Sequence, residues 1–204
     1  AAALNNLGML ADDRNDHATA RAHYELAAEI YRDLQDRAHL GMVLANLGTT
    51  LLGMNDLVAA EAASREFLKL AQETADPWCT ATALHNLGET ALKRGDYEKA
   101  GELLRRAAPA LADLGDVPQV LQVLLACGRV AAWKREAELA VTLFGAVESI
   151  QSAESIFLSE NDLAELRDAK ARARADVSSE EFDAAWNRGT ALEIPQAVQL
   201  GLTI

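Results

Sequence analysis

The chain has 204 residues, of which half are hydrophobic and only 5% aromatic, and its formal net charge is −12. This negative charge disfavours binding to the phosphate backbone of nucleic acids, because proteins bind nucleic acids largely through Lys and Arg contacts that release counterions. No apolar run is long enough to cross a bilayer, and no secretory leader is apparent. We therefore expect a cytoplasmic chain that binds neither nucleic acid nor membrane directly.

A short sequence block returns at a constant interval and predicts the architecture. The block, Leu-x-x-Leu-Gly or a looser copy, begins at Leu4, Leu44, Leu84 and Leu124. A small residue stands twelve positions after each glycine of the block, at Ala20, Ala60, Ala100 and Ala140. Self-similarity at a fixed period of this length is typical of a solenoid, in which each unit covers its neighbour. Prolines are few and strand-like runs are missing, so we predict an all-α chain.

Each repeat is predicted to be a pair of helices joined by a short turn. The expected turns are Asn15-Asp16, Asn55-Asp56 and Gly95-Asp96, which are residue types that tolerate turn geometry. The fourth turn, Lys134-Arg135-Glu136, has no Gly or Asn. Either this turn differs in geometry, or Arg135 takes a mildly strained conformation.

We place the repeats at residues 1–36, 38–76, 78–116 and 117–151. Within the second repeat, Ser64 and Phe67 stand where the first has Tyr24 and Ala27. We interpret this exchange as a volume-conserving swap that keeps the interface filled. Cys127 replaces the leucine of the other repeats and is expected to be a buried thiol.

After about residue 151 the repeat register stops, and residues 152–204 are predicted to form capping helices. Terminal units of a solenoid need an atypical form that covers the exposed end. We expect one helix from about Ser159 to Ala175, a second beginning at Ser178 or Ser179, and a short last one beginning at Pro195.

The repeat spacing resembles a known family. The register of Leu4, Leu7, Gly8, Ala11, Ala20, Tyr24 and Ala27 resembles the tetratricopeptide repeat, lengthened from about 34 residues. Phe144-Gly145-Ala146 and the later stretch 181–189 resemble the C-terminal part of bacterial LuxR-type and AfsR/SARP-type signal-transducing ATPase regulators. The resemblance implies a right-handed helical-hairpin solenoid. It also implies ATPase and DNA-binding domains upstream in the same polypeptide, with the repeats sensing a ligand or partner.

The first helix of each repeat is expected to line a concave groove. Asn6, Asn46 and Asn86 share one register position, and their amides can hold an extended peptide backbone, as in the asparagine ladder of peptide-binding tetratricopeptide proteins. Alternatively, this row caps or bridges adjacent helices. The predicted groove neighbours are Asn5, Met9, Met42, Thr49, His85, Glu89, Lys93, Arg129 and Trp133. For each neighbour taken alone, plain solvent exposure is the simpler interpretation.

No sequence pattern points to catalysis. A Gly-rich phosphate loop, a His-Glu-x-x-His helix and a paired Cys-x-x-Cys are all missing. We therefore predict no enzyme, no metal and no cofactor. The groove is expected to take a peptide, a protein segment or a small effector. The alternative is a passive scaffold that self-associates, and a homo-oligomer is compatible with either.

Overall fold

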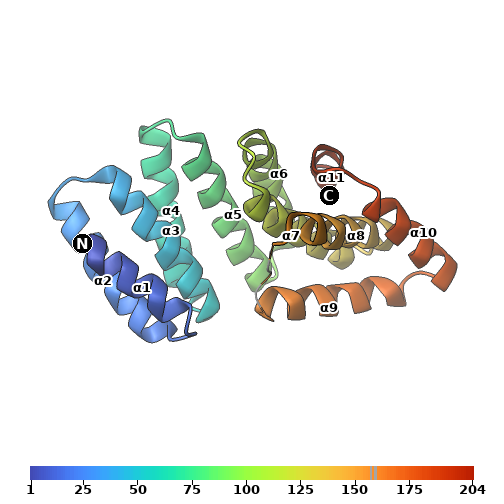
Figure 1. Ribbon diagram of the computed structural model, residues 1–204, viewed down its shortest axis with the longest axis horizontal. Coiled ribbons are helices and arrows are strands. Elements are labelled where there is room, and N and C mark those ends of the chain that lie inside the picture. Colours follow the sequence, from blue (N-terminus) through green and yellow to red (C-terminus); the bar gives the residue numbers. More distant parts are fainter. Residues whose placement is uncertain (157, 159) are drawn as a thin grey trace. The chain divides into compact units, whose positions relative to one another are not determined.

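The computed structural model describes residues 1–156, 158 and 160–204, and all regular structure within them is α-helical (Figure 1). Its helices are α1 (Ala2–Asp12), α2 (His17–Asp33), α3 (Arg37–Gly53), α4 (Leu57–Glu73), α5 (Pro77–Arg94), α6 (Tyr97–Asp113), α7 (Val117–Trp133), α8 (Ala137–Glu154), α9 (Glu160–Ala175), α10 (Ser179–Thr190) and α11 (Ile194–Gly201). None of these helices is long and apolar enough to span a membrane. Ser159, the expected start of a C-terminal helix, lies outside the described residues.

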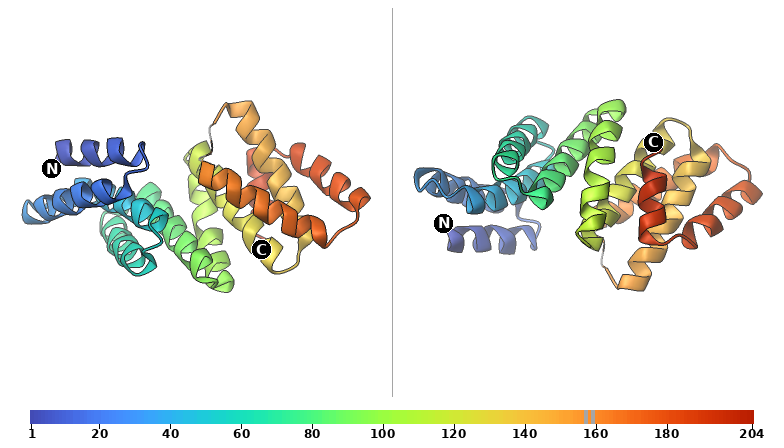
Figure 2. Two further views of the ribbon diagram at one scale, coloured as in Figure 1. Left: turned by 90° about the horizontal axis from the view of Figure 1, so that it is seen from below. Right: turned by 90° about the horizontal axis from the view of Figure 1, so that it is seen from above.

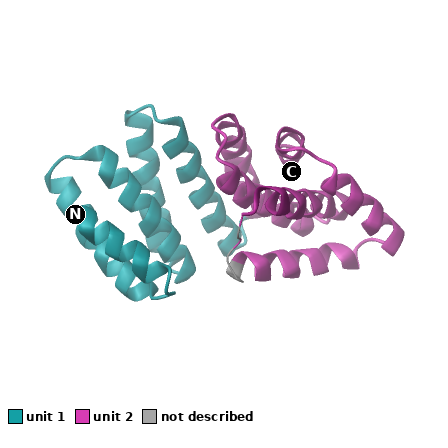
Figure 3. Cartoon of the chain, in the orientation of Figure 1, with its two compact units in different colours: residues 1–96 teal, residues 97–204 magenta. Residues whose placement is uncertain are grey.

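The chain forms two compact units, shown in Figure 3. Unit 1 is Ala1–Asp96 and holds α1 to α5, each packed on the next along the chain. Unit 2 is Tyr97–Ile204, where α6, α7 and α8 pack in succession and α9, α10 and α11 pack around them. The boundary between the units falls inside the segment predicted as the third repeat. The division into four repeats stays a prediction.

Left-handed turns recur at half the period of the sequence repeat, so they occur twice in each copy. Positive φ angles of 52° to 80° occur at Asn15, Gln35, Asn55, Ala75, Gly95, Gly115, Arg135 and Ser155. An acidic residue follows in seven of the eight cases, at Asp16, Asp36, Asp56, Asp76, Asp96, Asp116 and Glu136. The predicted turns at Asn15, Asn55 and Gly95 are confirmed, and Arg135 takes the strained conformation.

The aspartates after these turns start the helices. The Asp16 carboxylate accepts a hydrogen bond from the Thr19 backbone N–H, and the aspartates at 36, 56, 76 and 116 accept the equivalent bond. Each bond satisfies one of the N–H groups that the first helical turn leaves unpaired. Ser178 caps α10 in the same way, within a complete capping box, at one of the two predicted starting positions.

We expect Ala75→Gly to stabilise unit 1 and Gly95→Ala to destabilise it. A side chain in the left-handed region costs about 1–2 kcal/mol, whereas the greater freedom of unfolded glycine offsets only part of that. Ala75→Gly should thus raise the free energy of unfolding by about 0.5–1 kcal/mol, and Gly95→Ala should lower it by about 1 kcal/mol. Urea unfolding measures both changes. Equal signs for the two variants would contradict this explanation.

Two glycines of the repeat block lie under aromatic rings. A Cβ atom on Gly8 would stand 2.5 Å from Tyr24 Cε1, and one on Gly128 would overlap the ring of Phe144. These glycines therefore allow α1 to approach α2 closely and α7 to approach α8 closely. Burial and the nearby Asp12 carboxylate raise the pKa of the Tyr24 hydroxyl, so the ring stays neutral.

Two of the sequence expectations concern single buried side chains. Phe67 is fully buried, and its ring faces Gly41, where an added Cβ would lie 3.4 Å from Cε2. The exchange with Ser64 therefore leaves a filled interface, as predicted. Cys127 is a buried free thiol, also as predicted.

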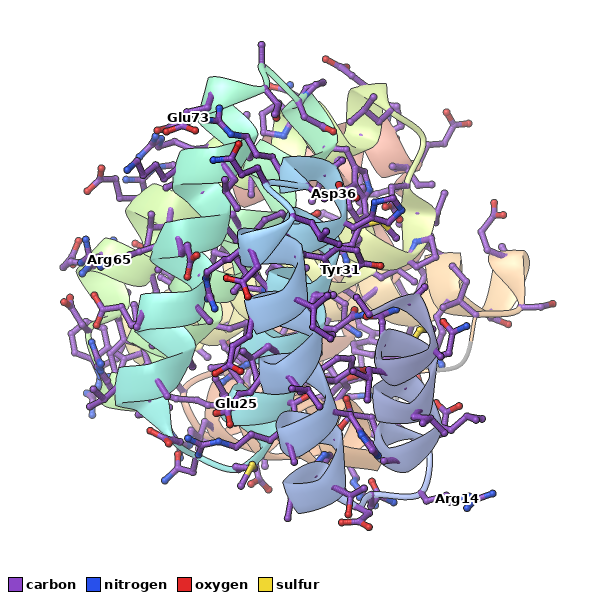
Figure 4. All side chains as sticks on the ribbon, turned by 90° about the vertical axis from the view of Figure 1, so that its left-hand side faces the viewer. Arg14, Glu25, Tyr31, Asp36, Arg65 and Glu73 are labelled. Atoms are coloured by element: carbon purple, nitrogen blue, oxygen red, sulfur yellow. The ribbon has the colours of Figure 1, made fainter. Side chains whose placement is uncertain are left out.

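Ion pairs link α4 to α2, to α3 and to α5 on the outer surface of unit 1. Arg32 holds both oxygens of Glu66 at 2.9 Å, and Arg37 lies 3.2 Å from Glu73, the last residue of α4, which is labelled in Figure 4. These pairs are well exposed, so each contributes little. Glu61 differs because its side chain is only 18% exposed and receives hydrogen bonds from both Arg65 and Arg94.

The Glu61 carboxylate should make unit 1 less stable in acid. Hydrogen bonds from Arg65 and then Arg94 lower the pKa of Glu61 from 4.5 to about 2. Because the folded-state pKa is the lower one, this contribution is complete above about pH 4.5 and is lost as the pH falls through about 2. At pH 7 we expect Glu61→Gln to lower the free energy of unfolding by about 1–2 kcal/mol. Near pH 2 we expect the variant and the parent chain to be equally stable. Thermal unfolding across that range checks this, and a constant gap would contradict it.

The C-terminal helices enclose α8. A Cβ atom on Gly145 would lie 2.7 Å from the carbonyl oxygen of Trp186, so α8 and α10 cross backbone to backbone. On the exposed side, Lys170 Nζ lies 3.6 Å from the centroid of the Trp186 ring. At the chain end Ile204 is buried, and its carbonyl accepts a hydrogen bond from Arg105.

Candidate functional site

Two neighbouring first helices of unit 1, α1 and α3, present an exposed and uncharged surface. We call it the α1–α3 face, made of Asn5, Asn6, Met9, Met42, Asn46 and Thr49. Met9 is 49% and Met42 53% exposed, while Asn6 and Thr49 are also exposed. In a chain with 25% charged residues, a neutral surface on two adjacent helices is a distinctive feature.

The α1–α3 face is held together by an amide bridge. Asn46 Nδ2 donates to Asn5 Oδ1 over 3.1 Å, from α3 to α1, and both side chains are half-buried. Asn5 Nδ2 also lies 3.7 Å from the sulfur of Met9, within reach of a weak hydrogen bond. The bridge fixes the two helices beside each other and orients Met9.

A second link between these helices centres on Asp12, at the end of α1. Thr50 of α3 donates to Asp12 Oδ2 over 2.7 Å, and His17 Nδ1 lies 2.9 Å from Asp12 Oδ1. The same carboxylate raises the pKa of the nearby Tyr24 hydroxyl. Helices α1, α2 and α3 therefore meet at one acceptor, which fixes the spacing of the face.

The asparagine row is not uniformly exposed. Asn86 is only 5% exposed, and its Nδ2 donates to the Ala45 carbonyl over 3.4 Å. Asn46 and Asn86 therefore bridge adjacent first helices, which agrees with the alternative interpretation of the row. Asn6 is exposed, so among the three it is the one that presents its amide to solvent.

The other predicted residues of α5 are covered. His85 is 8% exposed, and its Nε2 lies 4.0 Å from Glu89 Oε1. Glu89 and Lys93 are half-buried. The binding role predicted for these three residues stays a prediction, whereas the α1–α3 face is the part of the predicted groove that lies open within unit 1.

In unit 2 a helix lies on the corresponding surface of α7. Helix α9 packs against α7 and α8, as Figure 2 shows. Arg129 of α7 forms an ion pair with Glu165 of α9 at 2.6 Å, and Gln122 Nε2 donates to Asp162 Oδ2 over 3.0 Å. The predicted groove residue Arg129 therefore contacts the chain's own helix. Trp133 is 49% exposed and stacks on Tyr97 at 4.3 Å.

Unit 2 also contains a cleft that the sequence did not indicate. Its volume is about 900 Å³, and apolar side chains supply much of its wall. The walls come from the α7–α8 turn, the start of α8, the α9–α10 turn and α11, including Ala137, Leu139, Val177, Leu192 and Leu200. Because half of the lining residues lie outside the repeat register, periodicity gives no signal for the cleft. The described residues contain no cluster of side chains suited to a metal ion.

Comparison with known proteins identifies the fold. Residues 1–36 and 80–109, about a third of the chain, match the family described as tetratricopeptide repeat. A crystal structure of nearly identical TPR-like repeats, from a Podosopora anserina protein described as a putative kinesin light chain, is similar to this chain with a TM-score of 0.65. The two sequences are 16% identical, and the alignment covers 97% of this chain and 93% of the other. A single-substitution variant of those repeats gives a TM-score of 0.66 at 17% identity, covering 97% of this chain and 95% of its own. No curated protein sequence matches significantly.

At this identity the similarity establishes the fold alone. The chain has an all-α, tetratricopeptide-type helical-hairpin solenoid fold, as the repeat predicted. Repeats of this type stack helix pairs and expose first-helix surfaces along the stack. The α1–α3 face is such a surface.

Proposed function

We propose that this chain is a protein-interaction module whose α1–α3 face holds a segment of a partner protein. The observation that carries the proposal is the exposed, uncharged pair Met9 and Met42 on adjacent first helices that Asn5 and Asn46 hold in register. Methionine side chains are flexible and polarizable, so they adapt to varied apolar partners. The exposed Asn6 amide adds a donor and an acceptor beside them.

We further propose that the module is the sensor or interaction domain of a cytoplasmic bacterial transcriptional regulator, with ATPase and DNA-binding domains upstream. The support is the resemblance of Phe144-Gly145-Ala146 and of residues 181–189 to the end of such regulators. In this structure the two segments meet, because Gly145 of α8 lies against α10. A bound partner would bias the upstream switch only by its difference in affinity for the two switch states.

Site-specific photocrosslinking tests the binding face. A photoreactive amino acid at Met42 should crosslink one recurrent partner in cells, and the same group at Val58, which is 77% exposed on α4, should not. Met9→Glu should abolish the crosslink from position 42 without lowering the thermal stability of the chain. Equal crosslinking from positions 42 and 58 would show that the face is not selective.

Self-association is a second candidate, favoured by a different surface of α1. Leu7 and Leu10 are 47% and 53% exposed, whereas Leu47 and Thr50, at the same register positions of α3, are 6% and 2% exposed. An apolar pair exposed in this way is a typical contact between protein molecules. Light scattering over a concentration series should show a dimer that Leu7→Glu with Leu10→Glu converts to a monomer. A parent chain that stays monomeric at high concentration would exclude this candidate.

A further inference from the structure

Helix α9 shows what kind of segment a first-helix surface of this chain accepts. Gln122 and Arg129 lie two repeat periods after Met42 and Thr49, so the two pairs hold the same register positions on α7 and α3. On α7 both positions contact α9, through Asp162 and Glu165. The two positions of α7 that correspond to Met42 and Thr49 are therefore covered by an α-helix.

Helix α9, which covers this surface of α7, is amphipathic, and its buried face is made mostly of small side chains. Leu166, Ala169 and Ala173 of α9 are 7%, 7% and 1% exposed, at the spacing of one helical face. Small residues at two of three positions let the helix lie close to α7 and α8. The acidic pair Asp162 and Glu165 then meets the polar pair on α7.

The α1–α3 face has a different chemistry at the same positions. Met42 replaces Gln122 and Thr49 replaces Arg129, and no cation stands among the six residues of the face. If a bound helix had carboxylates at the positions of Asp162 and Glu165, these carboxylates would find no equivalents of Gln122 and Arg129 on the α1–α3 face. Apolar side chains at these positions would instead contact the methionine thioethers.

We infer that the α1–α3 face binds an amphipathic α-helix, an inference that rests on the proposed protein-binding function. This helix has a buried stripe of small residues like that of α9, and it has apolar residues at the positions of Asp162 and Glu165. This is the helix-in-groove mode of recognition, in which one helical face supplies the contacts. An extended peptide held by asparagine amides is not the preferred occupant, because Asn46 and Asn86 already donate within the chain.

Three synthetic peptides test this inference against the full chain by fluorescence anisotropy. The first has the sequence of residues 160–175 with Asp162→Leu and Glu165→Leu. The second is the unchanged sequence, and the third adds Ala169→Pro to the first in order to break the helix. We expect the first to bind and to gain helicity, and each of the others to bind at least ten-fold more weakly.

Variants of the protein locate the bound peptide. Met42→Glu should weaken binding of the first peptide at least ten-fold, and the matched surface change Val58→Glu on α4 should leave it within two-fold. Glu165→Ala in the protein loosens α9 from α7. A rise in peptide affinity in that variant would mean that the peptide takes the place of α9, which overturns the inference.

The remaining outcomes separate the inference from the function on which it rests. If the proline peptide binds as tightly as the first and both require Met42, the face binds peptides without selecting a helix. That result overturns the inference and leaves the protein-binding function standing. Absence of binding by all three peptides also overturns the inference, whereas the function is then decided by crosslinking from position 42.

Discussion

A Gly189→Ala variant should lose about 3 kcal/mol or more of the free energy of unfolding of unit 2, because α8 and α10 touch backbone to backbone at this glycine. An added Cβ would stand 2.9 Å from the carbonyl carbon of Thr142 and 3.0 Å from the Ala146 nitrogen, with the Thr142 oxygen closer still. Backbone atoms in two packed helices cannot move aside as a flexible side chain can. The helices must separate, and the loss extends to Phe182 and Ala185, which α10 buries.

Gly101→Ala is the matched control for this substitution. It also lies inside a helix of unit 2, yet the nearest atoms to an added Cβ are Arg105 Nη1 at 3.5 Å and Val130 Cγ1 at 3.6 Å. Because alanine favours a helix more than glycine does, this change should be neutral or stabilising by up to about 1 kcal/mol. In a Trp78→Phe background, tryptophan fluorescence during urea unfolding reports on unit 2 alone. Similar losses in both variants would contradict the backbone-contact explanation.

A Phe67→Ala variant should cost unit 1 about 3–5 kcal/mol, the range found for emptying a buried aromatic site. Phe67 is fully buried between α4 and α3, and its ring faces Gly41, which has no side chain to fill the space that alanine would leave. In the first repeat the corresponding residue is Ala27, and there Tyr24 supplies the bulk instead. Ser64 cannot do this in the second repeat, so the cavity would stay open.

A graded series separates cavity formation from a general disturbance of α4. Phe67→Leu keeps most of the volume and should cost roughly half as much as Phe67→Ala, whereas Val58→Ala, at a surface position of the same helix, should change stability by less than about 0.5 kcal/mol. Urea unfolding followed by circular dichroism gives all three values. A Phe67→Ala loss near that of Val58→Ala would show that the site collapses around the smaller residue.

The helices and their order could be predicted from the sequence because the same contacts recur in each copy. Gly8 under Tyr24 and Gly128 under Phe144 repeat one packing solution, and a periodic pattern reports it directly. The turns are predictable only where residue type gives a signal, as at Asn15 and Gly95. Ala75 has no such preference and takes a left-handed conformation because the helices on both sides fix it.

The candidate site could be predicted less well, because a register position says which helix face a residue is on and not what covers that face. Asn6 and Asn86 are equivalent in the repeat, yet one is exposed and the other is 5% exposed. Arg129 is equivalent to Thr49, but its partner Glu165 comes from a helix outside the repeat. Contacts of this kind lie between segments that share no period, so self-similarity carries no information about them.

The even spacing of the left-handed turns limits which length changes this gene can tolerate. Deleting one helix together with one turn would preserve every remaining backbone bend. After the deletion, however, every later first helix of a pair would occupy the place of a second helix. Its asparagines would then face the wrong neighbours. Deleting a helix pair with both of its turns preserves the bends and also the alternation of first and second helices. Only the gain or loss of whole helix pairs therefore leaves each remaining side chain facing the same neighbouring helix as before.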